Sequence, residues 1–186
     1  MLKITKDSVP TLRQRSAPVP MPMDEKTKAT LREMMDYLRL TQDPKFLSKH
    51  PEAREGVGLA APQIGVNLRM LVISYPTYDE KGEPNGKIEY ALVNPRIMST
   101  STKMAYLQGG EGCLSVDEPH PGRVYRHYKI TVNAYDLLQE KDISIVARGY
   151  DAIVLQHEID HLDGILFYDR IDKRDPDRDI PGSVAI

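Results

Sequence analysis

Apolar residues follow two different periods along this chain, and each period predicts a different kind of element. In residues 25–40 they recur at the i, i+3, i+4, i+7 spacing of one helix face, at Leu31, Met34, Met35 and Leu38. Asp24 precedes this stretch and can cap a helix by accepting a backbone hydrogen bond. The pattern therefore predicts an amphipathic helix near the N-terminus, with its methionines filling the core.

Short apolar runs in the middle of the chain predict β-strands. Residues 69–74 (RMLVIS) form a buried strand, and residues 90–97 (YALVNPRI) form a second one, which Pro95 ends or confines to a sheet edge. The turn residues between them, over 78–89, predict an exposed hairpin loop. Residues 129–149 alternate apolar and polar side chains and predict a further β-hairpin.

A second helix is expected over residues 150–163, with Gly164 placed for its C-terminal cap. Residues 41–55 are polar and form a surface connection, and residues 174–186 form an extended tail. Strands fill the middle and helices lie near the ends, which is typical of the α+β class rather than a βαβ series. We expect one domain over residues 1–186, with antiparallel sheets packed around the second helix.

Composition narrows the range of partners and compartments. The 186 residues are 40% hydrophobic and 28% charged with a net charge of −2, which gives no electrostatic footprint for nucleic acid or anionic lipid. No apolar run is long enough to span a bilayer, and the charged N-terminus lacks the apolar core of a secretion signal. The single cysteine, Cys113, excludes an intrachain disulfide and fits a reducing compartment. We therefore expect a cytoplasmic protein.

The sequence QHEIDH, residues 156–161, places two imidazoles on the second helix. His157 and His161 are four residues apart and share one face, so both can reach one metal ion. Glu158 can lie beside that ion and accept a proton from water. The alternative is a charged surface helix with two histidines. Apolar neighbours make a buried helix more plausible, and buried polar groups require a partner or a function.

The third ligand must come from upstream. A metzincin-type site would place a histidine at position 167, where this chain has Phe167, and no glutamate follows Gly164. Cys113 lies in a glycine-rich segment, GGEGCLS, that allows a close backbone approach to a metal. On its own Cys113 could also be a buried small residue or a nucleophile paired with His157. Together with both histidines it gives a sulfur and two nitrogens with one open position, as in catalytic sites.

A third motif, GVGLAAPQIG over residues 56–65, has two interpretations. It can be a glycine turn followed by small residues that pack on the core. It can also be a strand with a bare backbone that pairs with an extended peptide, with the amide N–H of Gln63 directed at a developing oxyanion.

Taken in order, GVGLAAPQ, EGCLS and QHEIDH resemble the three motifs of the peptide deformylases, particularly the longer, type 2 bacterial form. The resemblance covers essentially the whole chain. It implies a catalytic metallohydrolase domain that removes the formyl group from N-terminal formylmethionine. It implies one divalent ion, natively Fe(II), with Zn, Ni or Co as substitutes.

The resemblance also implies roles for individual residues. The metal ligands would be Cys113, His157 and His161. Glu158 would be the general acid/base, and Gln63 with the Leu114 N–H would form the oxyanion hole. Substrate contacts would come from Gly58, Val57, Leu59 and Ile153.

The implied partners are N-formylmethionyl nascent peptides, with a transient ribosome contact, and the implied state is a monomer. Prolines break the nearly charge-balanced tail, so the basic ribosome-docking helix of some relatives is not expected here. There are two competing hypotheses: a metallopeptidase or other amidase, and a non-catalytic metal-binding protein. Cleavage of formyl-Met-Ala but not acetyl-Met-Ala would support a deformylase over either of them.

Overall fold

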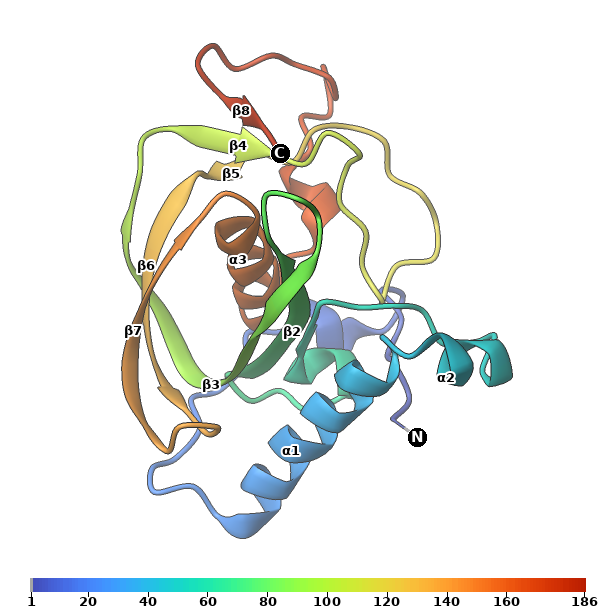
Figure 1. Cartoon of the computed structure of the whole chain (residues 1–186), viewed down its shortest axis with the longest axis vertical. Coiled ribbons are helices and arrows are strands. Elements are labelled where there is room, and N and C mark those ends of the chain that lie inside the picture. Colours follow the sequence, from blue (N-terminus) through green and yellow to red (C-terminus); the bar gives the residue numbers. More distant parts are fainter. Residues whose placement is uncertain (1) are drawn as a thin grey trace.

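A computed structural model describes residues 2–186 and shows an α+β architecture (Figure 1). The helices are α1 (Glu25–Leu40), α2 (Pro44–Lys49) and α3 (Tyr150–Leu162), with short 3-10 turns at Pro10–Arg13, Ala61–Ile64 and Phe167–Arg170. The strands are β1 (Gly58–Ala60), β2 (Met70–Tyr78), β3 (Pro84–Thr100), β4 (Met104–Tyr106), β5 (Arg126–His127), β6 (Lys129–Asp136), β7 (Lys141–Arg148) and β8 (Val184–Ala185).

The main sheet has five antiparallel strands in the order β1-β2-β3-β6-β7. It curls around α3, which lies between its two halves (Figure 1). Apolar side chains of α3, including Val154, Leu155 and Ile159, pack with β2, β3, β6 and β7 in one core cluster. The expectation of antiparallel sheets around a central helix is therefore confirmed. A small second sheet, β5-β4-β8, covers one end of the helix.

Helix α1 forms as its sequence predicts. The side chain of Asp24 accepts a 2.6 Å hydrogen bond from the backbone N–H of Thr27 and caps the first turn. The predicted stripe is buried in a second core cluster, against the other face of β2 and β3: Leu31, Met34, Met35 and Leu38. Capping and a continuous apolar stripe together fix the position and the orientation of this helix.

Two predictions about strands were wrong: the effect of Pro95 on its strand and the length of the exposed loop. Pro95 neither ends its strand nor lies at an edge, because β3 runs through it at the centre of the sheet. The pairing of β3 with β6 shifts between Val93 and Arg96, and Asn94 has a φ of 51°, so a bulge accommodates the residue without a ladder donor. The exposed loop is also shorter than predicted, since β2 and β3 stay paired out to Tyr78 and Pro84.

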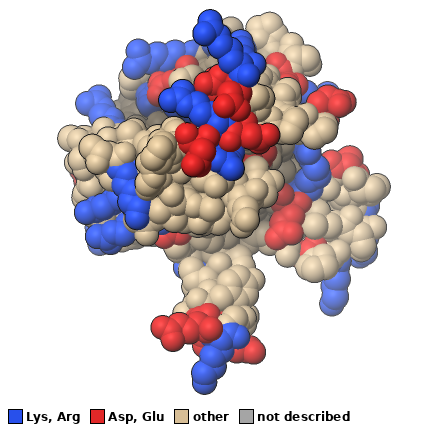
Figure 2. All heavy atoms as spheres, turned by 90° about the horizontal axis from the view of Figure 1, so that it is seen from above, with Lys and Arg blue, Asp and Glu red and all other residues tan. Residues whose placement is uncertain are grey.

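The C-terminal half follows the predicted pattern. Strands β6 and β7 form the expected hairpin, and Gly164 adopts a φ of 74° just after α3. The tail is extended apart from turns at residues 176–177 and 181–182 and strand β8, which pairs in parallel with β4. Basic and acidic side chains are interspersed on the face seen in Figure 2, in keeping with the small net charge. Within residues 2–186, no helix has the length and apolar character needed to cross a bilayer.

Candidate metal centre

Helix α3 carries three polar side chains of the predicted site into the interior. His161 is fully buried and Glu158 is 4% exposed, whereas His157 is partly exposed to the pocket. The helix enters the core because its remaining faces are apolar, at positions that include Ile153 and Leu162. Burial lowers the pKa of His161 well below its ordinary value and keeps the ring neutral, as a metal ligand must be.

Cys113 meets both histidines. Its Sγ lies 3.3 Å from Nε2 of His161, and one ligand atom from each of Cys113, His157 and His161 lies within 4.8 Å of the others. A divalent ion sits about 2.0–2.3 Å from thiolate and imidazole donors, so small side-chain adjustments would seat one here. Burial opposes a charge on His157, but hydrogen bonds with Cys113 and Glu111 prevail and raise its pKa. These residues fit a divalent metal.

Glu111 supports the site, and the sequence reasoning did not assign it a role. It accepts a 2.8 Å hydrogen bond from Nδ1 of His157, and it accepts two more from Nε and Nη2 of Arg126, at 2.5 and 2.9 Å. Burial opposes its ionisation, but these bonds prevail and lower the pKa of Glu111 to about 2. Arg126 also donates to Asp160 at 2.8 Å. The charged residues around the ligands therefore form one connected network.

Glu158 lies against the bare backbone of β1. A Cβ at Gly58 would come within 2.6 Å of Cδ of Glu158, so a residue without a side chain is required there. Burial raises the pKa of Glu158 to about 7, against the opposing charges of His157 and Arg126. Its Oε2 has no hydrogen-bond partner among residues 2–186. A carboxyl group of this kind is suited to exchanging protons near neutral pH.

Gln63 is held in one orientation by its two ends. Its Oε1 accepts a 2.8 Å hydrogen bond from the backbone N–H of Ala60. Its Nε2 donates to Oγ of Ser115 at 3.1 Å and points at Sγ of Cys113, 3.5 Å away. The amide nitrogen of Gln63 is thus held between the buried hydroxyl of Ser115 and the thiol of Cys113.

Arg54 holds the segment that carries Cys113, and no sequence signal indicated this role. We term residues 111–116 the cysteine loop. The guanidinium of Arg54 donates to three backbone carbonyls of this loop: Cys113 at 3.0 Å, Leu114 at 2.8 Å and Val116 at 3.1 Å. From the N-terminal segment, Lys6 donates to the same Leu114 carbonyl at 3.3 Å. Two cations therefore fix the carbonyls of the loop whose thiol faces the histidines.

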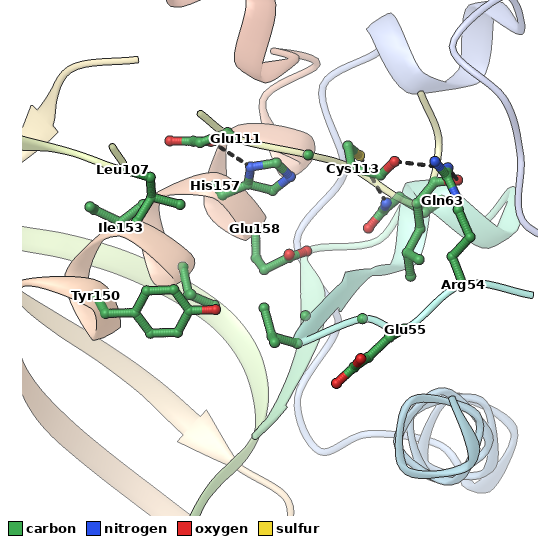
Figure 3. A pocket seen from close by; sticks show the side chains of 16 residues that line it. Arg54, Glu55, Gln63, Leu107, Glu111, Cys113, Tyr150, Ile153, His157 and Glu158 are labelled. Carbon is green, nitrogen blue, oxygen red and sulfur yellow. Dashed lines mark hydrogen bonds and ion pairs between the residues drawn. The ribbon is translucent and has the colours of Figure 1, made fainter. Parts of the chain in front are cut away.

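A pocket of about 320 Å³ opens beside these residues. In Figure 3, His157 and Glu158 lie at its centre, Cys113 and Gln63 on one side, and Leu107, Tyr150 and Ile153 on the other. The pocket therefore has a polar side and an apolar side. Of the predicted substrate-contacting residues, Val57, Gly58 and Ile153 line it, together with Leu114. Leu59 is not among the residues that line the pocket, because its side chain is fully buried in the core beside α1 and its backbone pairs with Val72 of β2.

The comparisons with known proteins agree with this geometry. Residues 1–177 match the family model described as polypeptide deformylase. The chain is 45% identical over 186 residues to "Peptide deformylase 2" of Geobacillus stearothermophilus, covering 100% of this chain and 97% of that one. It superposes on a probable peptide deformylase of Synechococcus phage S-SSM7 with a TM-score of 0.71 at 34% identity, covering 91% and 99%. A Met-Ala-Ser-bound enzyme of Acinetobacter baumannii gives a TM-score of 0.69 at 30% identity, covering 92% and 98%.

Proposed function

The chain belongs to the polypeptide deformylase family, and from this premise we propose the role of each residue at its metal centre. It is a metal-dependent amide hydrolase that removes the formyl group from the N-terminal formylmethionine of nascent polypeptides and releases formate. One observation carries the assignment of residues. Ligand atoms of Cys113, His157 and His161 lie within 4.8 Å of one another, and Cys113, His157 and Glu158 line the pocket beside them.

The ligands of the divalent ion are Cys113, His157 and His161, and Fe(II) is the native ion. Thiolate and imidazole ligands also suit Zn, Ni and Co, so the choice of iron rests on the family resemblance and not on the donor set. When bound, the ion supplies Lewis-acid chemistry and makes water acidic near neutral pH. Glu111 keeps the second nitrogen of His157 protonated and hence directs the other nitrogen at the ligand position.

Glu158 moves the proton. It takes one from the attacking water, whose oxygen forms the new bond to the formyl carbon. The tetrahedral adduct then collapses with cleavage of the carbon–nitrogen bond, and Glu158 returns the proton to the leaving amine. The products are formate and a free N-terminus. A raised pKa of about 7 lets the same carboxyl group accept and donate within one cycle.

Gln63 and the backbone N–H of Leu114 stabilise the negative charge that develops on the formyl oxygen. The amide of Gln63 is already oriented by Ala60 and Ser115, so little reorganisation is needed when the charge forms. The Leu114 N–H shares its peptide plane with the carbonyl of Cys113, which accepts a 3.0 Å hydrogen bond from Arg54, so this contact fixes the direction of the N–H. Such preorganised donors are worth roughly 3 kcal/mol each in comparable sites.

The peptide substrate pairs with β1. This strand lies at the edge of the sheet, and among residues 2–186 its ladder partner is β2. Val57 bonds to β2 through its carbonyl, so the backbone of Gly58, between Val57 and Leu59, faces the free edge and can pair with an extended peptide. The side chain of the first residue lies on the apolar side of the pocket, against Ile153. The Acinetobacter relative was crystallised with Met-Ala-Ser, the kind of product this arrangement releases.

The enzyme works as a single catalytic domain over residues 1–186, as a cytoplasmic monomer, with a transient ribosome contact and no nucleic-acid or membrane partner. The free thiol of Cys113 supports the reducing compartment. The interspersed charge on the face in Figure 2 supports a weak rather than a strong contact with the ribosome.

The test uses two substrates and one variant. The wild-type enzyme, prepared anaerobically with Fe(II), should hydrolyse formyl-Met-Ala and leave acetyl-Met-Ala intact. Glu158→Gln should retain the metal and lose deformylation by several orders of magnitude. The matched variant Glu118→Gln, at an exposed position near the cysteine loop, should behave as wild type. Near-normal turnover by metal-loaded Glu158→Gln would contradict the proton-transfer role.

A further inference from the structure

Tyr75 and Asp151 make a hydrogen bond behind the apolar side of the pocket. The hydroxyl of Tyr75, on β2, donates to Oδ1 of Asp151 at 2.6 Å, from the first turn of α3. Tyr75 is 7% exposed, and burial together with Asp151 raises the pKa of its hydroxyl above the ordinary value. The hydroxyl therefore stays a donor over the working pH range. Neither residue lines the pocket itself.

The same tyrosine contacts the aromatic wall of the pocket. The rings of Tyr75 and Tyr150 meet edge to face, with centroids 5.4 Å apart and planes at 83°. Tyr150 lines the pocket opposite the polar side, and its ring projects from the start of α3 in Figure 3. Asp151 is its neighbour in the chain. Tyr75 thus restrains Tyr150 twice, once through its ring and once through the adjoining residue.

Packing alone does not fix the ring of Tyr75. A small cavity of about 40 Å³ lies beside it, with walls that are mainly apolar: Ile73, Ile88, Tyr90, Ile145, Val146, Ala147 and Leu155. A ring that borders such a space can tilt into it once its hydroxyl is released. Tyr150 is 37% exposed, so it also lacks a packed partner on its outer side. The hydrogen bond to Asp151 therefore adds a directional restraint on both rings to the packing of Tyr75 in the core.

We propose that Tyr75 is a positioning residue that, through Asp151, fixes the ring of Tyr150 as one wall of the subsite for the first side chain of the substrate. This inference rests on the proposed function, since it assigns that subsite to the apolar side of the pocket. A fixed aromatic wall defines the width of the subsite, and width is what separates a long unbranched side chain from a bulkier or shorter one.

The test is Tyr75→Phe, which keeps the ring and removes the donor. Kinetics are measured with formyl-Met-Ala-Ser and with formyl-Ala-Ala-Ser, whose methyl group does not reach the wall. The KM for the methionine substrate should rise about three- to tenfold with kcat changed less than twofold, and the alanine substrate should be unaffected. The Kd of the product Met-Ala-Ser, measured by calorimetry, should rise by the same factor. Equal changes for both substrates would overturn the inference.

Two further variants separate positioning from general damage. Tyr90→Phe is the matched control, because Tyr90 borders the same cavity and its hydroxyl has no hydrogen-bond partner among residues 2–186. It should leave both substrates unchanged. Asp151→Asn keeps an acceptor oxygen and should restore most of the selectivity lost in Asp151→Ala, while Tyr75→Phe combined with Asp151→Ala should lose no more than either change alone. If the losses of selectivity in the two single variants added up in the double variant, Tyr75 and Asp151 would act independently, which would contradict the inference.

The outcomes also distinguish a failure of this inference from a failure of the proposed deformylase activity. If the wild-type enzyme does not hydrolyse formyl-Met-Ala-Ser, the proposed function fails. If it does, and Tyr75→Phe leaves the preference for methionine over alanine unchanged, only the role of Tyr75 fails.

Discussion

Nδ1 of His157 donates a 2.8 Å hydrogen bond to Oε2 of Glu111, and this carboxylate is itself held by Arg126 through two hydrogen bonds. The side chains of Glu111 and Arg126 are 3% and 1% exposed, so the pair is shielded from solvent. His157, one of the proposed ligands, is thereby fixed in one tautomer and one ring orientation by groups outside the proposed ligand set.

Glu111→Gln should weaken metal binding. The amide cannot hold both Arg126 and His157 as a charged acceptor does, so the affinity for Zn should fall about 10- to 100-fold. Competition with a chromogenic chelator measures this directly. Glu118→Gln, in an exposed part of the same segment, serves as the control. An unchanged affinity in Glu111→Gln would mean that the backbone orients His157 without help from the carboxylate.

Arg54→Met should slow the reaction by misplacing the cysteine loop. The variant loses the donors to the carbonyls of Cys113, Leu114 and Val116 while keeping most of the side-chain volume. We expect kcat to fall about tenfold, since small displacements of oriented groups are costly. Arg54→Lys, which can reach one or two of these carbonyls, should lie between the variant and the wild type. Arg32→Met, at an exposed position of α1, is the control and should leave kcat unchanged.

Gly58→Ala should displace either Glu158 or strand β1. The new Cβ would lie 2.6 Å from Cδ of Glu158, which is far inside van der Waals contact. We expect kcat/KM to fall about 100-fold, with a loss of unfolding free energy of about 1–3 kcal/mol. Gly109→Ala meets no atom within 4 Å among residues 2–186 and should be close to wild type in both measurements. Similar behaviour of the two variants would show that this contact is unimportant.

Glu89 should make stability depend on pH in the acid range. The hydrogen bond from Arg39 outweighs burial and, with a second bond from Lys87, lowers the pKa of Glu89 from its usual 4.5 to about 2. A folded-state pKa below the unfolded one contributes stability above about pH 5, and this contribution is lost as pH falls toward 2. Solvent screening of the exposed cations limits it to about 1–2 kcal/mol.

Denaturant titrations from pH 2 to pH 7 check this dependence. Glu89→Gln should be less stable than the wild type at pH 7, and the two should converge near pH 2. Glu80→Gln, at an exposed position between β2 and β3, should run parallel to the wild type over the whole range. If the free energies of unfolding of Glu89→Gln and wild type differed by the same amount at every pH, the substitution would act through packing rather than through charge.

Features that depend on spacing within one element could be predicted from the sequence. The stripe on α1 and its cap at Asp24 follow from the 3.6-residue period and from side-chain chemistry, and both are present in the structure. The spacing of His157 and His161 placed two candidate ligands on one helix face. The absence of any later glutamate, together with Phe167, indicated an upstream third candidate, Cys113.

Rules based on single residues were less reliable. Pro95 predicted an edge strand, yet a bulge absorbs it at the centre of the sheet, because a proline costs a ladder bond only where the ladder is regular. The turn residues over 78–89 predicted a loop, but pairing with β2 extends the strands through most of them. Local preferences of about 1 kcal/mol yield to the cooperative pairing of neighbouring strands.

The tertiary structure alone decided which distant groups surround the reacting centre. Glu111 and Arg126 are 15 residues apart, Arg54 and Leu114 are 60 apart, and Tyr75 and Asp151 are 76 apart. No period or motif in a single sequence relates such positions, since their contact depends on how the sheet curls around α3. The sequence identified the candidate ligands and the candidate base, and the fold supplied the charges and the rings that surround them.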